Sequence, residues 1–400
     1  GGNIYSVNGA VAGGQAYEVM SGTSMAAPQV AGMAALVAQY IRENGLKEKT
    51  GVSVRHLAQS LLMSTAEPVY DASTKSWYSI LKQGAGLANV SNAIHAESYV
   101  LVDGQPDGKV KVELGDDPDR TGVYSADFTL NNLTDEAIEY TLSADVFTQA
   151  PVSSEGVLYL LPKTVSMAAN VVWTVDGKVL TAPSELTAYD FDKDGDTDAD
   201  DAQLLLDDVT AGAGKLKADV DGDGDTDTHD VSELLKLISA AKVVLPADGS
   251  ISVHVTFSLI DEEKEFLDAY YTNGAYVEAF LYANPVSAED GVERVSHSIP
   301  VLGFYGNWSD ASMFDKGTLS EYWYEKETRN PYLPDSDGSP NMFGNMVTVK
   351  YANEDGEYYY FGNPLAEDDE YVPARNALNN ENGDQIFKLY FASIRNAGDA

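Results

Sequence analysis

The sequence contains no cysteine. This excludes disulfide bonds and thiolate metal sites, although it does not exclude secretion. Basic residues are also scarce: 25 Lys and Arg stand against 63 Asp and Glu, so the formal net charge is −38. Nucleic acids and anionic membranes bind through basic patches, and we therefore expect neither as a partner.

A long, uninterrupted apolar run is lacking as well. The longest charge-free apolar stretch, Met25 to Tyr40, has 16 residues and contains Pro28 and Gln29. This is short for a membrane span, and we predict a buried core helix instead. We recognise no signal peptide or transmembrane segment. Because the chain starts without Met, we expect it to be an internal fragment of a longer protein.

A motif near the start of the chain carries the first functional prediction. Residues 22–32 read Gly-Thr-Ser-Met-Ala-Ala-Pro-Gln-Val-Ala-Gly. Ser24 would stand at the start of a helix, where backbone N–H groups and the helix dipole can stabilise an oxyanion. Gly22 lets the chain turn into this helix, and Pro28 is predicted in the first turn, where no N–H is required. The alternative interpretation is an apolar helix that follows a Gly-Thr-Ser segment and has no catalytic role.

This segment resembles the nucleophile segment of subtilisin-family serine proteases. The resemblance implies that Ser24 attacks the carbonyl of a polypeptide substrate and forms an acyl-enzyme. The triad of the family runs in the order Asp, His, Ser. Residues 1–23 contain neither Asp nor His, and all five histidines follow Ser24. We therefore expect the full-length parent to be the enzyme and this fragment to be inactive alone.

The first part of the chain is predicted to be α/β. We interpret residues 1–97 as the C-terminal part of a subtilisin-like catalytic domain. Apolar spacing predicts helices from the serine motif to about residue 43, over about 54–66 and near 91–96. The fold class is accordingly multidomain, with this partial α/β domain followed by β domains.

The period of the apolar residues changes to two from Asp107 onward. This alternation predicts an antiparallel β-sandwich formed by residues 98–186 and 242–312. The order of parts resembles the lactocepin-type cell-envelope proteinases, in which a fibronectin III-like domain follows the protease domain. A further, incomplete β domain is expected at 313–400, with a hairpin turn at 353–356.

Two acidic twelve-residue loops, 190–201 and 219–230, repeat at a spacing of 29. Oxygen side chains stand at positions 1, 3, 5, 9 and 12 and glycine at position 6, which suits the six to eight oxygens that Ca²⁺ requires. The predicted side-chain ligands are Asp190, Asp192, Asp194, Asp198 and Asp201, and Asp219, Asp221, Asp223, Asp227 and Asp230. Asp196 and Asp225 at position 7 would supply backbone carbonyls. The alternative, a disordered acidic spacer, does not explain why the leucines after each loop keep the same register.

The duplicated loops, with one helix each and Asp at position 12, resemble dockerin type I modules. The resemblance implies a small all-α module over residues 187–241 that is inserted in the sandwich and holds two Ca²⁺ ions. Dockerins often bind cohesins through positions 10 and 11, which here are Ala199-Asp200 and Thr228-His229 instead of Ser-Thr. A cohesin partner therefore stays an alternative to a local structural role.

The sequence as a whole predicts a fragment of an extracellular serine endopeptidase, bacterial and either secreted or associated with the cell wall. The other hypothesis is a calcium-dependent adhesion or cohesin-docking protein that carries an inactive protease remnant.

Overall fold

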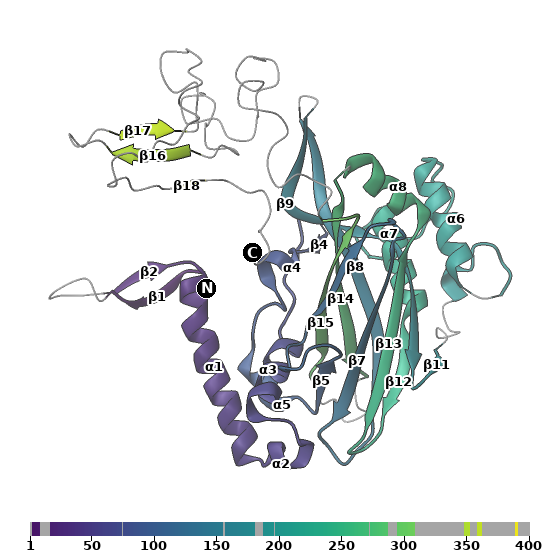
Figure 1. Cartoon of the computed structure of the whole chain (residues 1–400). Coiled ribbons are helices and arrows are strands. Elements are labelled where there is room, and N and C mark those ends of the chain that lie inside the picture. Colours follow the sequence, from purple (N-terminus) through teal and green to yellow (C-terminus); the bar gives the residue numbers. More distant parts are fainter. Residues whose placement is uncertain are drawn as a thin grey trace. The chain divides into compact units, whose positions relative to one another are not determined.

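We obtained a computed structural model of the chain (Figure 1). The described residues are 2–8, 17–73, 75–154, 157–180, 187–195, 197–271, 273–286 and 294–308, and the strands 348–352, 358–361 and 389–390. The chain divides into two compact units, residues 1–308 and 309–400.

The larger unit begins with a helical part that also holds two short hairpins. Its elements are β1 (Ile4–Val7), β2 (Tyr17–Met20), α1 (Thr23–Glu43), α2 (Leu46–Thr50), α3 (Val54–Ser64), β3 (Tyr70–Asp71), β4 (Ser76–Trp77), α4 (Ile80–Gln83) and α5 (Val90–His95). The three helices predicted from apolar spacing are confirmed as α1, α3 and α5. Side-chain caps begin two of them: the Ser53 hydroxyl accepts from the His56 N–H at the start of α3, and the Asn89 amide oxygen accepts from the first turn of α5.

The predicted core helix α1 is buried on one side only. Val37 and Ile41 are its buried residues, and they pack with Leu57 and Leu61 of α3. Leu36, in contrast, is 56% exposed. Apolar content alone predicted burial, but a helix is buried only where another element covers it, and here α3 and α5 cover one side.

Two sheets follow the helical part. The strands of both are β5 (Ser98–Val102), β6 (Val112–Asp117), β7 (Val123–Asn132), β8 (Ile138–Ser154), β9 (Val157–Met167), β10 (Ala169–Val175), β11 (Lys178–Val179), β12 (Ala241–Leu245), β13 (Ser250–Leu259), β14 (Ala275–Pro285) and β15 (His297–Tyr305). One sheet has the order β11-β10-β13-β7-β5 and the other β12-β8-β14-β15-β6, with β9 paired to β8. Helix α8 (Asp261–Tyr270) connects β13 to β14.

Side chains from both sheets form a single core. Along β7, Tyr124, Ala126, Phe128 and Leu130 are buried while their neighbours are not, which confirms the alternation read from the sequence. One pairing differs from the expectation of antiparallel strands: β6 lies parallel to β15 at the sheet edge. A period of two reports which face of a strand is buried and carries no information on its direction.

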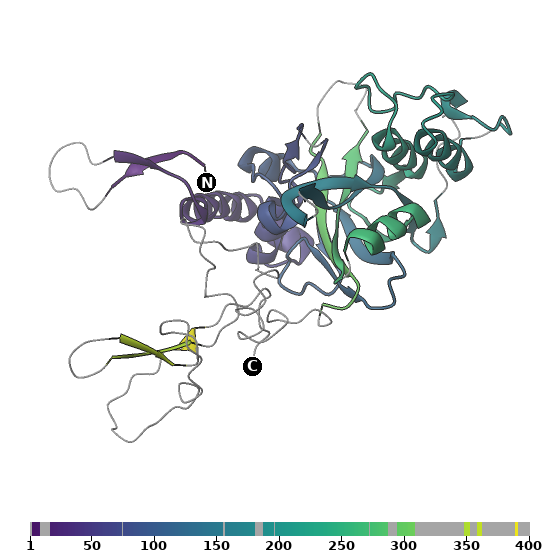
Figure 2. The same ribbon diagram turned by 90° about the horizontal axis from the view of Figure 1, so that it is seen from above.

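The acidic segment forms a small helical module with a core of its own. Thr187–Tyr189 is a short 3-10 helix, and α6 (Ala199–Thr210) and α7 (Thr228–Ser239) follow the two loops. The predicted leucines pack together around Leu205 and Leu234, both fully buried. In Figures 1 and 2, α6 and α7 lie on one side of the sheets and α1, α3 and α5 on the other.

In the smaller unit, β16 (Thr348–Ala352) pairs with β17 (Tyr358–Phe361) and with β18 (Leu389–Tyr390), both antiparallel. The predicted strand pair is confirmed. The predicted turn at 353–356 lies outside the described residues.

Candidate functional site

Ser24 lies at the N-terminus of α1, as the motif predicted. Gly22 adopts φ 151° and ψ 172°, a backbone conformation in which a residue with a Cβ is strained, so this position requires glycine. The Gly22 carbonyl accepts from the Met25 and Ala26 N–H groups and so begins the helix. Ser24 is the second residue of α1, and it is exposed. A nucleophile in this place has helix N–H groups directly beside it.

Pro28 lies deeper in the helix than predicted. Because α1 begins at Thr23, Pro28 falls in the second turn, where its missing N–H leaves the Ser24 carbonyl without the usual helical donor. The prediction that the proline sits in the first turn was therefore wrong by a few residues, since the motif shows the order of residue types but not where hydrogen bonding begins.

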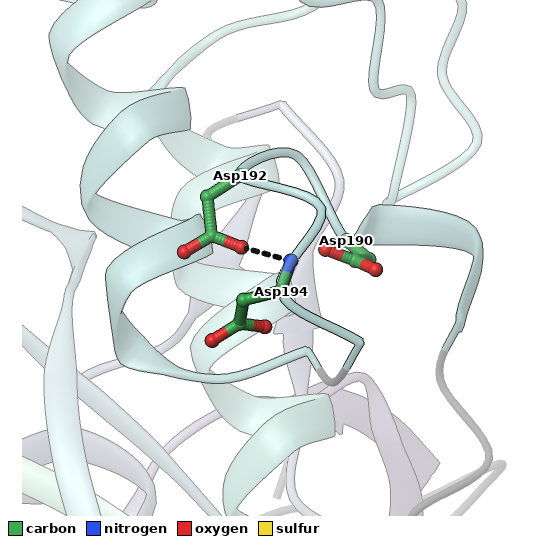
Figure 3. Close-up of side chains that lie close together, drawn as sticks. All are labelled: Asp190, Asp192 and Asp194. Atoms are coloured by element: carbon green, nitrogen blue, oxygen red, sulfur yellow. Dashed lines mark hydrogen bonds between the residues drawn. The ribbon is translucent and has the colours of Figure 1, made fainter.

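The structure brings the acidic side chains of both loops together. In the first loop, carboxylate oxygens of Asp190, Asp192 and Asp194 lie within 4.8 Å of one another (Figure 3). In the second loop, the same holds for Asp219, Asp221 and Asp230, and for Asp225, Asp227 and Asp230. Asp198, Asp201 and Asp223 lie outside these groups. Asp196, predicted to bind through its carbonyl, is outside the described residues.

Position 12 has the same role in both loops. The Asp201 carboxylate is 1% exposed and accepts from the N–H groups of Phe191, Asp192 and Asp198. Asp230 is fully buried and accepts from the corresponding N–H groups of Val220, Asp221 and Asp227. Each carboxylate thus closes its loop onto the start of its own helix.

Position 9 caps the helix that follows each loop. Asp198 accepts from the Asp200 N–H at 2.8 Å, and Asp227 accepts from the His229 N–H at 2.7 Å. In each case the side chain at position 12 completes a capping box. The repeat seen in the sequence is therefore also a repeat of hydrogen bonds.

The donor set fits a hard divalent cation. Its side-chain donors in these groups are carboxylate oxygens, the ligand type that Ca²⁺ prefers. One oxygen of Asp190 is buried without a hydrogen-bond partner, which is costly unless a cation takes its lone pairs. The Asp194 N–H lowers the pKa of Asp192, but desolvation and the charges of Asp194, Asp201 and Asp190 outweigh it and raise that pKa above its ordinary value. The first loop is thus crowded with negative charge.

The second half of the module is attached to the sheets. Lys236 on α7 forms an ion pair of 2.6 Å with Asp145 on β8, and the Trp77 indole N–H donates to the other oxygen of Asp145 at 2.9 Å. Lys75, in the same hairpin as Trp77, reaches the carboxylates of the second loop. These attachments were not predicted, because they join segments far apart in the sequence.

A buried polar cluster around His297 was also missed. Its Nε2 lies 2.7 Å from the Ser98 hydroxyl and its Nδ1 lies 2.9 Å from the Ser64 hydroxyl, while Ser98 also contacts the Tyr140 hydroxyl. Burial lowers the pKa of His297 to about 4. The cluster joins α3 to β5, β8 and β15. The only signal in the sequence was a histidine at the start of an apolar strand.

Comparison with known proteins supports the interpretation of the first segment. Residues 2–94 match the subtilase family, Peptidase S8. The chain is 31% identical over 375 residues to a PII-type proteinase of Lactococcus lactis subsp. cremoris, a match that covers 88% of this chain and 15% of the proteinase. It is 25% identical over 329 residues to a C5a peptidase of Streptococcus pyogenes serotype M1, covering 80% of this chain and 21% of the peptidase.

These matches support a subtilisin-family protease. They agree with the resemblance drawn from residues 22–32. The chain spans about a fifth or less of the length of these relatives. Among the helices that the structure describes, none is long and apolar enough to cross a membrane.

Proposed function

We propose that the chain is part of an extracellular bacterial serine endopeptidase, secreted or associated with the cell wall, in which Ser24 is the nucleophile. The observation that carries the proposal is an exposed serine at the N-terminus of α1, within the segment that matches the subtilase family. It follows Gly22, whose backbone conformation requires glycine. Ser24 would attack the peptide carbonyl and form an acyl-enzyme, while helix N–H groups stabilise the oxyanion. The triad Asp and His would come from residues outside this chain.

Labelling of the full-length protein with a fluorophosphonate probe tests the role of Ser24. The probe should label Ser24, and Ser24→Ala should abolish both labelling and peptide hydrolysis. Ser21→Ala is the matched control, because Ser21 is an exposed serine three residues earlier that accepts from the Asn3 N–H. Full activity in Ser24→Ala, or labelling at another serine, contradicts the proposal. The 400-residue chain alone should give no turnover above background.

For residues 187–241, we propose a dockerin-like module that holds two Ca²⁺ ions, inserted in a fibronectin III-like sandwich. The carboxylate groups and the unpartnered oxygen of Asp190 support it. Because mutual repulsion of the carboxylates opposes folding without a cation, calcium should stabilise the module. A local structural role is favoured over cohesin docking, because α7 packs against β10 and β8.

Calorimetry and thermal melting test the calcium proposal. We expect two ions per chain and a lower melting temperature in chelator. Asp201→Ala and Asp230→Ala should each remove one site. A melting temperature that chelator leaves unchanged, together with no heat of calcium binding, contradicts the proposal.

A further inference from the structure

A lysine from a distant hairpin enters the second acidic loop. The Lys75 ammonium lies 3.9 Å from a carboxylate oxygen of Asp221, 3.9 Å from one of Asp225 and 3.7 Å from one of Asp227, and it contacts Asp223 directly. Positions 3, 5, 7 and 9 of this loop therefore already share one positive charge. A point charge that several carboxylates surround occupies the place of a bound cation.

In the first loop, Asp190 and Asp192 differ from their counterparts in the second loop. In the described part of the chain, no Lys or Arg side chain forms an ion pair with Asp190 or Asp192, and the partnerless oxygen of Asp190 lies in this loop. The two loops repeat the same hydrogen bonds at positions 9 and 12, and the ammonium of Lys75 beside the second loop is a difference between them.

The hairpin that carries Lys75 is fixed on both sides. The Thr164 hydroxyl of β9 donates to the Ser76 hydroxyl at 3.0 Å, and the Trp77 indole donates to Asp145. Asp145 in turn holds Lys236 of α7, the helix that follows the second loop. The anchored hairpin thus holds the Lys75 ammonium beside the second loop. A group that is tethered in this way competes with a free ion at a high effective concentration.

We propose that Lys75 is a built-in counter-cation of the second loop and competes with Ca²⁺ for its carboxylates. The proposal rests on the calcium binding proposed above. It makes the two loops unequal: the first loop binds Ca²⁺ directly, whereas the second must displace Lys75. The second loop is then a calcium-responsive link between the module and the hairpin at residues 70–77.

Calcium titration of the 400-residue chain tests this proposal, with Lys75→Gln as the variant. Lys163→Gln is the control, because Lys163 donates to Ser73 of the same hairpin. We expect the wild type to show two affinities at least about tenfold apart, which corresponds to about 1.4 kcal/mol. Lys75→Gln should tighten the weaker site by about that factor and Lys163→Gln should not. Asp192→Asn should weaken calcium binding to the first loop. It therefore shows which of the two measured affinities belongs to the second loop.

Melting temperature in chelator gives a second measurement. Lys75→Gln should melt lower than the wild type without calcium, because the second loop loses its cation, and the difference should vanish in saturating calcium. Two calcium sites that Lys75→Gln leaves unchanged would overturn this proposal alone. Absence of calcium binding in every variant would overturn the calcium proposal and this one together.

Discussion

The buried His297 makes the stability of the larger unit depend on pH. Both ring nitrogens are in contact with serine hydroxyls, and the residue is 1% exposed. Burial lowers its pKa from the ordinary 6.5 to about 4, because the interior disfavours the imidazolium. Between these two values the unfolded chain binds more protons than the folded one. Stability from His297 is therefore present above pH 6.5 and is lost as the pH falls through about 4.

The magnitude follows from the two pKa values. Integrating the difference in bound protons, His297 should add about 2.5 kcal/mol to the free energy of unfolding between about pH 4.5 and 7.5. Glu263 on α8 acts in the opposite direction, because burial raises its pKa to about 7. Its contribution is present below pH 4.5 and is lost as the pH rises through 7, by a similar amount. In the wild type the two contributions to the free energy of unfolding therefore largely cancel as the pH changes.

The experiment must therefore remove the contribution of Glu263 before that of His297 can be measured. In the Glu263→Gln background, urea unfolding followed by tryptophan fluorescence should show stability rising with pH over this range, and the added substitution His297→Gln should remove about 2.5 kcal/mol of that rise. His254→Gln is the matched control, because His254 is 44% exposed and pairs with Asp127 on the sheet surface. Equal pH profiles with and without His297 would refute the reasoning. Comparing profiles rather than single values separates the proton effect from lost packing.

Two further predictions concern single residues. Glu263→Gln alone should stabilise the protein at about pH 8 by up to about 3 kcal/mol and leave its stability at about pH 4.5 nearly unchanged, because only the ionised form is penalised by burial; equal gains at both values of pH would contradict this. Gly86→Ala should prevent stable folding of the helical part, because its φ is +116° and a Cβ would lie 2.3 Å from the Glu67 carbonyl oxygen. Gly104→Ala, at φ +77° with open space around it, should cost only about 1–2 kcal/mol in thermal melting.

Several features of the fold and of the candidate sites were predictable because their causes are local. The Gly-Thr-Ser lead and the apolar spacing after it predicted the start of α1 and the place of Ser24. Alternation predicted β7 and β13 with their buried faces. The two acidic loops repeat their hydrogen bonds because they repeat their residues, so Asp201 and Asp230 could be paired from the sequence. Capping, periodicity and turn chemistry act within a few residues.

The errors arose where one segment depends on another. Burial of α1 was predicted from composition, but only contact with α3 and α5 decides which of its residues are buried. The antiparallel arrangement was predicted from the spacing of alternating strands, whereas the direction of β6 depends on its pairing with β15 at the edge of the sheet.

The sequence by itself determined the types of chemistry present: a serine at a helix start, carboxylates in a repeated loop, and no thiol. Only the tertiary structure decided which of these groups meet. It brought Lys75 into the second loop, placed His297 between Ser64 and Ser98, and partly buried Glu263 against the Ala168 N–H at the start of β10. The physical reason is that such contacts depend on the packing of segments far apart in the chain, and burial and charge pairing, which shift the pKa of a group or occupy a metal site, exist only once that packing has formed.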